Sequence, residues 1–290
     1  MTPPDIAAPQ PFLVEPLVRA ALAEDLGRAG DLTTDTVVPK DARARGVLNA
    51  RQPGVVAGLC VAEMAFRLLD PDVRFSVARP DGVGVGANEP IATVNGRARA
   101  LLTAERVALN FLCRLSGIAT ATRAIVEAVQ GTRARIICTR KTTPGLRLLE
   151  KYAVRAGGGA NHRFGLDDGV LLKDNHIVVA GGIRAAVERA KAALGHMVKV
   201  EVEVDRLDQI REALAAGADA ILLDNMTPTE MREAVGIIGG RAVVEASGRI
   251  TAETARVIAA TGVDVISCGW ITHSAPILDI GLDFETSSTD

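Results

Sequence analysis

Aromatic residues are scarce in this chain of 290 residues: phenylalanine, tryptophan and tyrosine make up 3%, with one tryptophan and one tyrosine. Proteins that bind single-stranded nucleic acid stack bases on aromatic side chains, so this composition argues against such a function. Charge of one sign is also missing, because 35 acidic residues nearly balance 33 basic ones. We therefore expect no nucleic acid partner.

Long apolar runs are absent as well. No stretch reaches the roughly 18 consecutive apolar residues of a membrane span. Residues 1–13 lack the basic start and the apolar segment of a signal peptide. The four cysteines, Cys60, Cys113, Cys138 and Cys268, form no CxxC pair, so we interpret them as reduced thiols and not as disulfides or zinc ligands. We expect a cytoplasmic protein that has no contact with a membrane.

Common cofactor motifs are missing too. The glycines of GVGVGA (82–87) do not follow the GxGxxG spacing and open no predicted helix, which argues against a dinucleotide-binding fold. The chain contains neither the glycine-rich loop of nucleotide triphosphatases nor an HExxH motif. We expect no tightly bound organic cofactor.

Apolar residues, in contrast, make up 48% of the chain, enough for one large or two medium domains. In the C-terminal half, short β-branched runs alternate with alanine-rich helical stretches. The runs occupy residues 135–140, 169–175, 198–204, 220–225, 242–247 and 263–269. The predicted helices occupy residues 145–156, 180–194, 206–216, 228–238 and 252–261. This alternation predicts a parallel sheet, because each connection must cross a face of the sheet. Six such units predict an α/β fold, an incomplete (β/α) barrel.

Polar residues recur near the ends of these predicted strands. Glu203, Asp224, Glu245 and Ser267 follow one another at intervals of 21, 21 and 22 residues. A strand buried on both faces is nearly all apolar, so repeated polar positions are costly unless they line a site, and barrels carry their active sites at this rim. The alternative is that the acids cap the following helices. Capping would explain one or two of them but not the whole set.

The N-terminal part lacks this repeat. We predict helices at 14–26 and 61–69, strands at 43–50 and 55–60, and a long helix from about 101 to 130 that could break at Gly117. These elements predict a mixed α+β domain over residues 1–114, followed by the barrel over 115–274. Residues 275–290 contain a further strand that could join the first domain.

A basic segment lies between residues 133 and 163, where nine basic side chains accompany a single acid, Glu150. Such a concentration in a neutral protein indicates a small anionic ligand. For Arg147, Lys151 and Arg155, a solvated helix face is an equally good interpretation. The glycine-rich GGGANH (157–162) offers backbone amides to an anion, or alternatively forms a flexible helix end.

Eight segments resemble quinolinate phosphoribosyltransferases. They are EDLGRAGDLTT (24–34), ERVALNFLCRLSGIAT (105–120), TRKTTPGLR (139–147), GGGANHRFGLDDGVLLKDNH (157–176), EVEVD (201–205), LLDN (222–225), ASG (246–248) and THS (272–274). The resemblance covers nearly the whole chain, and the order and spacing of the segments make it specific. It implies a mixed α/β domain beside an incomplete α/β barrel. It also implies a decarboxylating pentosyltransferase of NAD biosynthesis, which converts quinolinate and phosphoribosyl pyrophosphate to nicotinate mononucleotide, carbon dioxide and diphosphate.

The resemblance also implies two groups of site residues. Those matching the quinolinate site of the family are Arg106, Thr139, Arg140, His162, Arg163 and Lys173. Those matching its phosphoribosyl pyrophosphate site are Lys141, Glu203, Asp224, Ser247, Gly248, Arg249, Cys268 and Gly269. A dicarboxylate needs several cations, and arginine binds a carboxylate through two hydrogen bonds. Glu203 and Asp224 would hold the ribose hydroxyls and Mg²⁺, partly through water or substrate, because Mg²⁺ prefers oxygen ligands.

The resemblance further implies a homodimer with composite active sites, compatible with a higher oligomer, because the arginine at Arg106 enters the site of the neighbouring subunit in the family. One position departs from the family pattern: Trp270 stands where a small residue is common. Three other functions stay open. They are a molybdenum-transport-associated paralogue of the same fold, a Schiff-base aldolase that uses Lys173, and a quinolinate-sensing barrel without catalysis. The intact NHR and ERVALN segments favour the transferase over the paralogue, and the presence of both residue groups argues against a sensor.

Overall fold

The computed structural model describes residues 6–285, and the chain forms two compact units. One runs to Arg123 and includes Thr143–Gly158 and the residues from Ser274 onwards. The other comprises Ala124–Thr142 and Gly159–His273. The predicted domain limits stay predictions, and their outermost parts, residues 1–5 and 286–290, lie outside the described residues.

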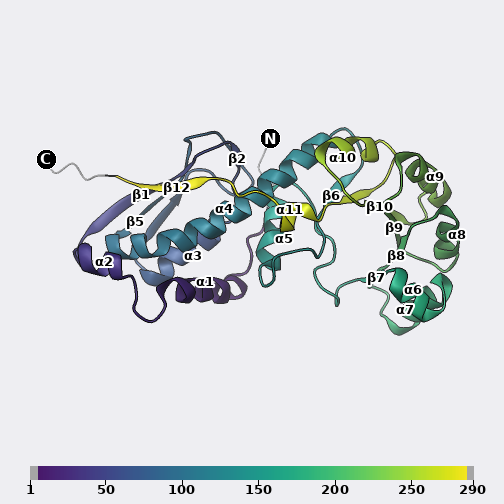
Figure 1. The fold of residues 1–290 in the computed structure, drawn as a ribbon, viewed down its shortest axis with the longest axis horizontal. Helices are drawn as coiled ribbons and strands as arrows, with labels where there is room; N and C mark the ends of the chain where they lie inside the picture. The colour runs from purple at the N-terminus through teal and green to yellow at the C-terminus, as the bar shows by residue number, and fades with distance from the viewer. Residues whose placement is uncertain (1–5, 286–290) are drawn as a thin grey trace. The chain divides into compact units, whose positions relative to one another are not determined.

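The second unit is built on a parallel sheet of six strands (Figure 1). The strands are β6 (Arg135–Ile137), β7 (Val170–Leu172), β8 (Val200–Val204), β9 (Ala220–Asp224), β10 (Val243–Ser247) and β11 (Val265–Ser267). Each lies within a predicted run. Their order is β6-β11-β10-β9-β8-β7, and within residues 6–285 the edge strands β6 and β7 do not pair with each other. The prediction of an incomplete (β/α) barrel is therefore confirmed.

Helices follow the strands, and all but the last of them cover the outer side of this sheet (Figure 1). They are α6 (Asp174–Ala180), α7 (Ile183–Ala193), α8 (Leu207–Ala215), α9 (Pro228–Ile238), α10 (Ala252–Ala259) and the short α11 (Trp270–His273). The helix predicted near 180–194 is α7, which begins at Ile183, whereas α6 was not predicted. Gly181 and Gly182, with φ of +89° and +127°, then separate α6 from α7. Both glycines adopt backbone conformations that other residues avoid, so the helix has to end there.

The strand register arranges the polar residues in two layers. Ser247 pairs with Asp224 on one side and with Ser267 on the other. Two residues earlier along the strands, Glu245 and Glu203 both pair with Leu222. The regular spacing in the sequence thus brings these residues to neighbouring strands, as predicted. Glu245, however, lies in the deeper layer and is only 2% exposed.

The first unit combines an antiparallel sheet with helices, which confirms the predicted mixed α+β character. The sheet order is β12-β1-β5-β3, and β2 pairs with β4. The strands are β1 (Arg43–Ala50), β2 (Gly54–Val55), β3 (Arg74–Val77), β4 (Gly84–Val85), β5 (Pro90–Arg97) and β12 (Ile280–Phe284). The helices are α1 (Pro11–Leu26), α2 (Leu32–Val37), α3 (Leu59–Leu69), α4 (Ala98–Ala128) and α5 (Arg147–Ala156). None of the helices in the described part of the chain is long and apolar enough to span a membrane.

One prediction for this region was wrong, and one possibility that the sequence left open did not occur. The strand expected at 55–60 stops at Val55, because Gly58, with φ of +103°, turns the chain into α3, and the Asp81 carboxylate accepts the N–H groups of Gly58 and Leu59. Helix α4 also runs through Gly117 without a break. A Cβ at Gly117 would lie 2.1 Å from the Pro276 carbonyl oxygen. This glycine therefore allows close packing and does not end the helix.

Candidate active site

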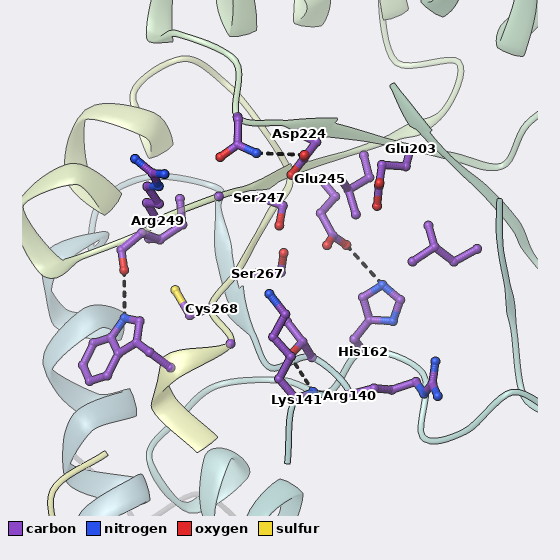
Figure 2. A pocket seen from close by; sticks show the side chains of 18 of the residues that line it. Arg140, Lys141, His162, Glu203, Asp224, Glu245, Ser247, Arg249, Ser267 and Cys268 are labelled. Carbon is purple, nitrogen blue, oxygen red and sulfur yellow. Dashed lines mark hydrogen bonds and ion pairs between the residues drawn. The ribbon is translucent and has the colours of Figure 1, made fainter. Parts of the chain in front are cut away.

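A pocket of about 690 Å³ opens at the carboxyl ends of the parallel strands. All the predicted site residues except Arg106 line it. Arg106 lies on α4. Figure 2 shows Glu203, Asp224 and Glu245 on one side of the pocket, with Lys141 and Arg140 on the other. The residues that the sequence spreads over more than a hundred positions thus share one cavity.

Cations gather at one end of the pocket. Arg163 donates from Nη1 to the Gly169 carbonyl at 2.8 Å. Its partial burial, and then the charge of Arg140, lower the pKa of Arg163, although a guanidinium stays charged at neutral pH. The Lys173 ammonium contacts the Glu203 carboxylate. The Arg140 and Arg163 guanidinium groups repel each other, and an anion bound between them would reduce this repulsion.

His162 is held in place by the protein on both sides of its ring. The backbone before it runs beside β6, since Ala160 donates to the Ile136 carbonyl at 2.8 Å. The N–H of Arg163 donates to His162 Nδ1 at 2.6 Å. His162 Nε2 lies 3.0 Å from Glu201 Oε2 and 3.6 Å from Glu245 Oε2. These contacts give the neutral tautomer with the proton on Nε2, so both ring nitrogens already have protein partners.

Glu245 is the most deeply buried acid of the pocket. Burial, and then the neighbouring Glu201, raise the pKa of Glu245 well above its usual value. Its Oε1 has no hydrogen-bond partner among the described residues. His162, Glu201 and Glu245 together offer ligand atoms within 4.8 Å of one another, and the raised pKa of Glu245 favours its protonated form.

Two half-buried acids face the pocket at the ends of neighbouring strands. Asp224 Oδ2 accepts a hydrogen bond from Asn225 Nδ2 at 2.8 Å, and Glu203 contacts Lys173 as described. The atoms available to a metal ion are therefore carboxylate oxygens, and water or substrate would occupy its remaining coordination positions. Such a set fits Mg²⁺, which keeps several waters and takes one or two carboxylates.

Two glycine-containing turns close the other end of the pocket: Ser247-Gly248-Arg249 after β10 and Ser267-Cys268-Gly269 after β11. Gly248 has φ of +112°, and a Cβ there would lie 2.3 Å from Asn225 Oδ1. A Cβ at Gly269 would lie 3.0 Å from Lys141 Cδ. Only glycine fits at Gly248, and the side chain of Lys141 passes directly over Gly269. Burial raises the pKa of the Cys268 thiol to about 12, so it is no nucleophile at neutral pH.

Comparison with known proteins accounts for this arrangement. Residues 31–116 match the N-terminal domain of quinolinate phosphoribosyl transferase, and residues 118–283 match the C-terminal domain. The chain belongs to the quinolinate phosphoribosyl transferase family. A carboxylating nicotinate-nucleotide pyrophosphorylase of Mycobacterium leprae is 45% identical over 273 residues, which cover 92% of this chain and 95% of that protein. A relative of the same name from Arabidopsis thaliana, described as chloroplastic, is 42% identical over 93% of this chain and 82% of its own length.

A solved structure shows the same fold. The nicotinate-nucleotide pyrophosphorylase of Francisella tularensis superposes with a TM-score of 0.92 at 40% identity, and the match covers 96% of this chain and 98% of that one. The prediction of the family, made from eight short segments, is thus confirmed. The roles of individual residues within the family site stay predictions for this chain.

Several residues of the pocket were not predicted as site residues. They include Asn225, Trp270 and His273, which line the cavity. Glu201, which does not line the cavity but holds His162, was also missed. A signal for Glu201 was present: it precedes Glu203 by two residues, so both side chains lie on the same face of β8. Asn225, Trp270 and His273 lie in the segments that follow the strands, and no regular spacing in the sequence distinguishes them from their neighbours.

Proposed function

We propose that this protein transfers the phosphoribosyl group of phosphoribosyl pyrophosphate to the ring nitrogen of quinolinate and releases carbon dioxide and diphosphate, giving nicotinate mononucleotide. One observation carries the proposal: a cationic end, two carboxylates and two glycine-containing turns line a single pocket. A protein that only sensed quinolinate would need the cationic end alone. A Schiff-base enzyme would need an available amine, whereas the Lys173 ammonium contacts Glu203.

Quinolinate binding falls to the cationic end. The two adjacent carboxylates of quinolinate lie between Arg140, Arg163 and Lys173. Without a bound anion, the two guanidinium groups repel each other. His162 has partners on both ring nitrogens. Its ring nitrogens are therefore occupied, and His162 contributes to quinolinate binding mainly through contact with the face of its fixed ring. Thr139 completes this end beside Arg140.

We assign phosphoribosyl pyrophosphate to the part of the pocket that the two glycine-containing turns, Lys141 and the two acids line. The monophosphate fits the turns that contain Ser247, Gly248 and Gly269, where backbone N–H groups can approach an anion without hindrance from side chains. The Lys141 ammonium, which has no partner among residues 6–285, is available to the diphosphate. Glu203 and Asp224 hold the ribose hydroxyls and would hold Mg²⁺. When bound, this ion supplies positive charge to the departing diphosphate.

The chemistry then needs positioning and charge neutralisation more than a reactive side chain. The bond between C1 of the ribose and the diphosphate oxygen breaks, and the electron pair leaves with the diphosphate beside Lys141. The pyridine nitrogen of quinolinate, aligned by the cationic end, forms the new bond to C1. The 2-carboxylate next leaves as carbon dioxide, the positive ring nitrogen stabilises the carbanion at C2, and that carbon takes up a proton.

We further propose a homodimer, or a higher oligomer built from it, in which Arg106 serves the active site of the neighbouring subunit. Arg106 lies on α4 and is the one predicted quinolinate ligand that does not line the pocket of its own chain. A two-fold dimer would make the two composite sites equivalent. We place the protein in the cytoplasm, since its four cysteines are unpaired, as is usual in a reducing compartment.

A direct assay tests the proposal. Purified protein is mixed with quinolinate, phosphoribosyl pyrophosphate and Mg²⁺, and nicotinate mononucleotide is followed by chromatography. We expect product only when both substrates are present, and we expect Lys141→Ala to lose most of the activity. Arg133→Ala is the matched control, because Arg133 pairs with Asp264 away from the pocket. Absence of product from the folded wild-type protein would exclude the proposed reaction and favour the molybdenum-transport-associated paralogue.

A further inference from the structure

Trp270 is the only tryptophan of the chain and the first residue of α11. It lines the pocket and is partly buried. Its indole Nε1 donates a hydrogen bond to the Ile250 carbonyl at 2.8 Å. A buried indole usually satisfies its N–H. Here the acceptor is a backbone carbonyl in a turn that lines the pocket.

This hydrogen bond joins equivalent turns of neighbouring strands. Ser247, the last residue of β10, pairs with Ser267, the last residue of β11. Ile250 lies three residues beyond the first and Trp270 three residues beyond the second. The indole therefore ties the turn after β10 to the turn after β11, and both turns form the end of the pocket that we assign to phosphate.

The turn after β10 needs such support. Gly248 and Arg249 have φ of +112° and +46°, and the left-handed conformation is unfavourable for an arginine. Unfavourable backbone conformations persist only when the surroundings hold them. The Arg249 guanidinium is exposed and lines the pocket, and it has no hydrogen-bond or ion-pair partner among the described residues. An unpaired cation on a strained turn is suited to an anionic ligand.

We propose that Trp270 is a positioning residue for the phosphoryl end of the site. By holding the Ile250 carbonyl, it keeps the Gly248-Arg249 turn in its left-handed conformation, and it thereby directs Arg249 towards the phosphoryl groups of phosphoribosyl pyrophosphate. The substrate named here rests on the proposed function. The tie between the two turns rests on the structure alone and applies to any phosphoryl ligand of this pocket.

Three variants separate this role from simple packing. Trp270→Phe keeps an aromatic ring and removes the N–H. Arg249→Asn removes the charge and keeps a residue that tolerates the left-handed conformation. The third variant carries both changes. We expect Trp270→Phe to raise KM for phosphoribosyl pyrophosphate about fivefold, as for the loss of one neutral hydrogen bond, with kcat and the KM for quinolinate within about twofold. Arg249→Asn should raise the same KM by about tenfold or more, because its hydrogen bonds to phosphate are charge-assisted.

The double variant carries the decisive result. If Trp270 acts through Arg249, the double variant is no worse than Arg249→Asn, and the two effects do not add. Additive effects would overturn the proposal, since Trp270 would then act independently of Arg249. A KM for phosphoribosyl pyrophosphate equal to that of the wild type in Trp270→Phe would overturn it as well.

Binding measured by the fluorescence of Trp270 does not depend on turnover or on the folding of the Trp270 variant. The wild-type protein is titrated with phosphoribosyl pyrophosphate and separately with inorganic phosphate, without quinolinate. We expect a saturable change of the single tryptophan signal with both ligands, and about tenfold weaker binding in Arg249→Asn. If neither ligand changes the signal, or if Arg249→Asn binds as the wild type does, the proposal fails. A wild-type protein that binds inorganic phosphate in this way but forms no nicotinate mononucleotide would keep the inference and refute the proposed function.

Discussion

His162 donates a hydrogen bond from Nε2 to Oε2 of Glu201 across 3.0 Å, while its Nδ1 accepts the N–H of Arg163. The ring thus lies between two protein partners, and Oε2 of the buried Glu245 lies 3.6 Å from the same Nε2. Two carboxyl groups beside one neutral imidazole cannot both be charged at low cost. Burial, and then the charge of Glu201, raise the pKa of Glu245 well above its usual value, which favours the protonated carboxyl at the base of the pocket.

The first prediction concerns stability and pH. The pKa of Glu245 is higher in the folded protein than its ordinary value of 4.5. The folded state therefore binds more protons than the unfolded state above this pH, and it loses stability as the pH rises towards the folded pKa. Glu245→Gln cannot ionise, so we expect its melting temperature, relative to the wild type, to increase between about pH 4 and pH 8. A difference that stays constant or falls over this range would show that Glu245 is ionised.

Asp70 provides a control of opposite sign. Burial alone would raise the pKa of Asp70, but hydrogen bonds from Arg97 and Asp72 and the charge of Arg97 lower it below its usual value. Its contribution to stability is present above the unfolded pKa and is lost as the pH falls through the folded pKa. The penalty of Asp70→Asn should therefore be greatest near neutral pH and shrink in acid. If Glu245→Gln and Asp70→Asn respond to pH in the same direction, one of the two assignments is wrong.

The second prediction concerns substrate charge. Nicotinate has one carboxylate and would leave part of the cluster of Arg140, Arg163 and Lys173 without a partner. A site built for a polar group rejects the analogue that lacks it, so we expect kcat/KM for nicotinate to be about ten-thousandfold lower than for quinolinate. Initial rates with both compounds at equal phosphoribosyl pyrophosphate measure the ratio. Comparable turnover of the two acids would contradict the assignment of the cationic end.

The third prediction separates the two ends of the pocket. Glu203→Gln and Asp224→Asn should reduce kcat/KM for phosphoribosyl pyrophosphate by about a hundredfold or more, because they remove charges that neutralise and position its polar groups. Binding of quinolinate alone should persist, since both acids are assigned to phosphoribosyl pyrophosphate and Glu203 reaches the quinolinate site only through Lys173. Calorimetry with quinolinate supplies the second readout. Loss of all quinolinate binding in both folded variants would refute the division of the pocket.

The fourth prediction tests the composite site. Arg106→Ala and Lys141→Ala should each be nearly inactive. In a dimer with one subunit of each kind, one site collects both defects and the other is intact, so random exchange restores about a quarter of all sites by symmetry. Co-expression with two different tags yields the mixed dimers. If purified mixed dimers stay as inactive as either parent, Arg106 serves its own chain.

The sequence was most informative where it repeats. The intervals of 21, 21 and 22 residues between Glu203, Asp224, Glu245 and Ser267 predicted correctly that four neighbouring strands carry polar side chains at one edge. Each β/α unit places its strand in the same sheet, so a constant period in the chain brings the polar residues to the same end of neighbouring strands. The period could not show that Glu245 lies one layer deeper than Asp224, because strand register depends on pairing with Leu222.

Local signals failed where long-range contacts decide the structure. The sequence left open a break of α4 at Gly117, yet the lack of a side chain at this residue allows contact with Pro276, which is distant in sequence. Short helices such as α2 and α6 were not predicted, since six or seven residues carry too little periodicity. The hydrogen bond of Trp270 to Ile250 joins two turns that follow different strands, so no spacing in the sequence could predict it.

The most direct test of the proposed reaction follows the carbon atom of the 2-carboxylate of quinolinate. Quinolinate labelled at the 2-carboxylate is incubated with the wild-type protein, phosphoribosyl pyrophosphate and Mg²⁺, and labelled carbon dioxide is measured beside nicotinate mononucleotide. We predict that the two products form in equal amounts and that neither forms without phosphoribosyl pyrophosphate, because the positive ring nitrogen made by phosphoribosyl transfer is what allows the carboxylate to leave. Release of labelled carbon dioxide without phosphoribosyl pyrophosphate, or formation of a nucleotide that retains the label, would contradict it.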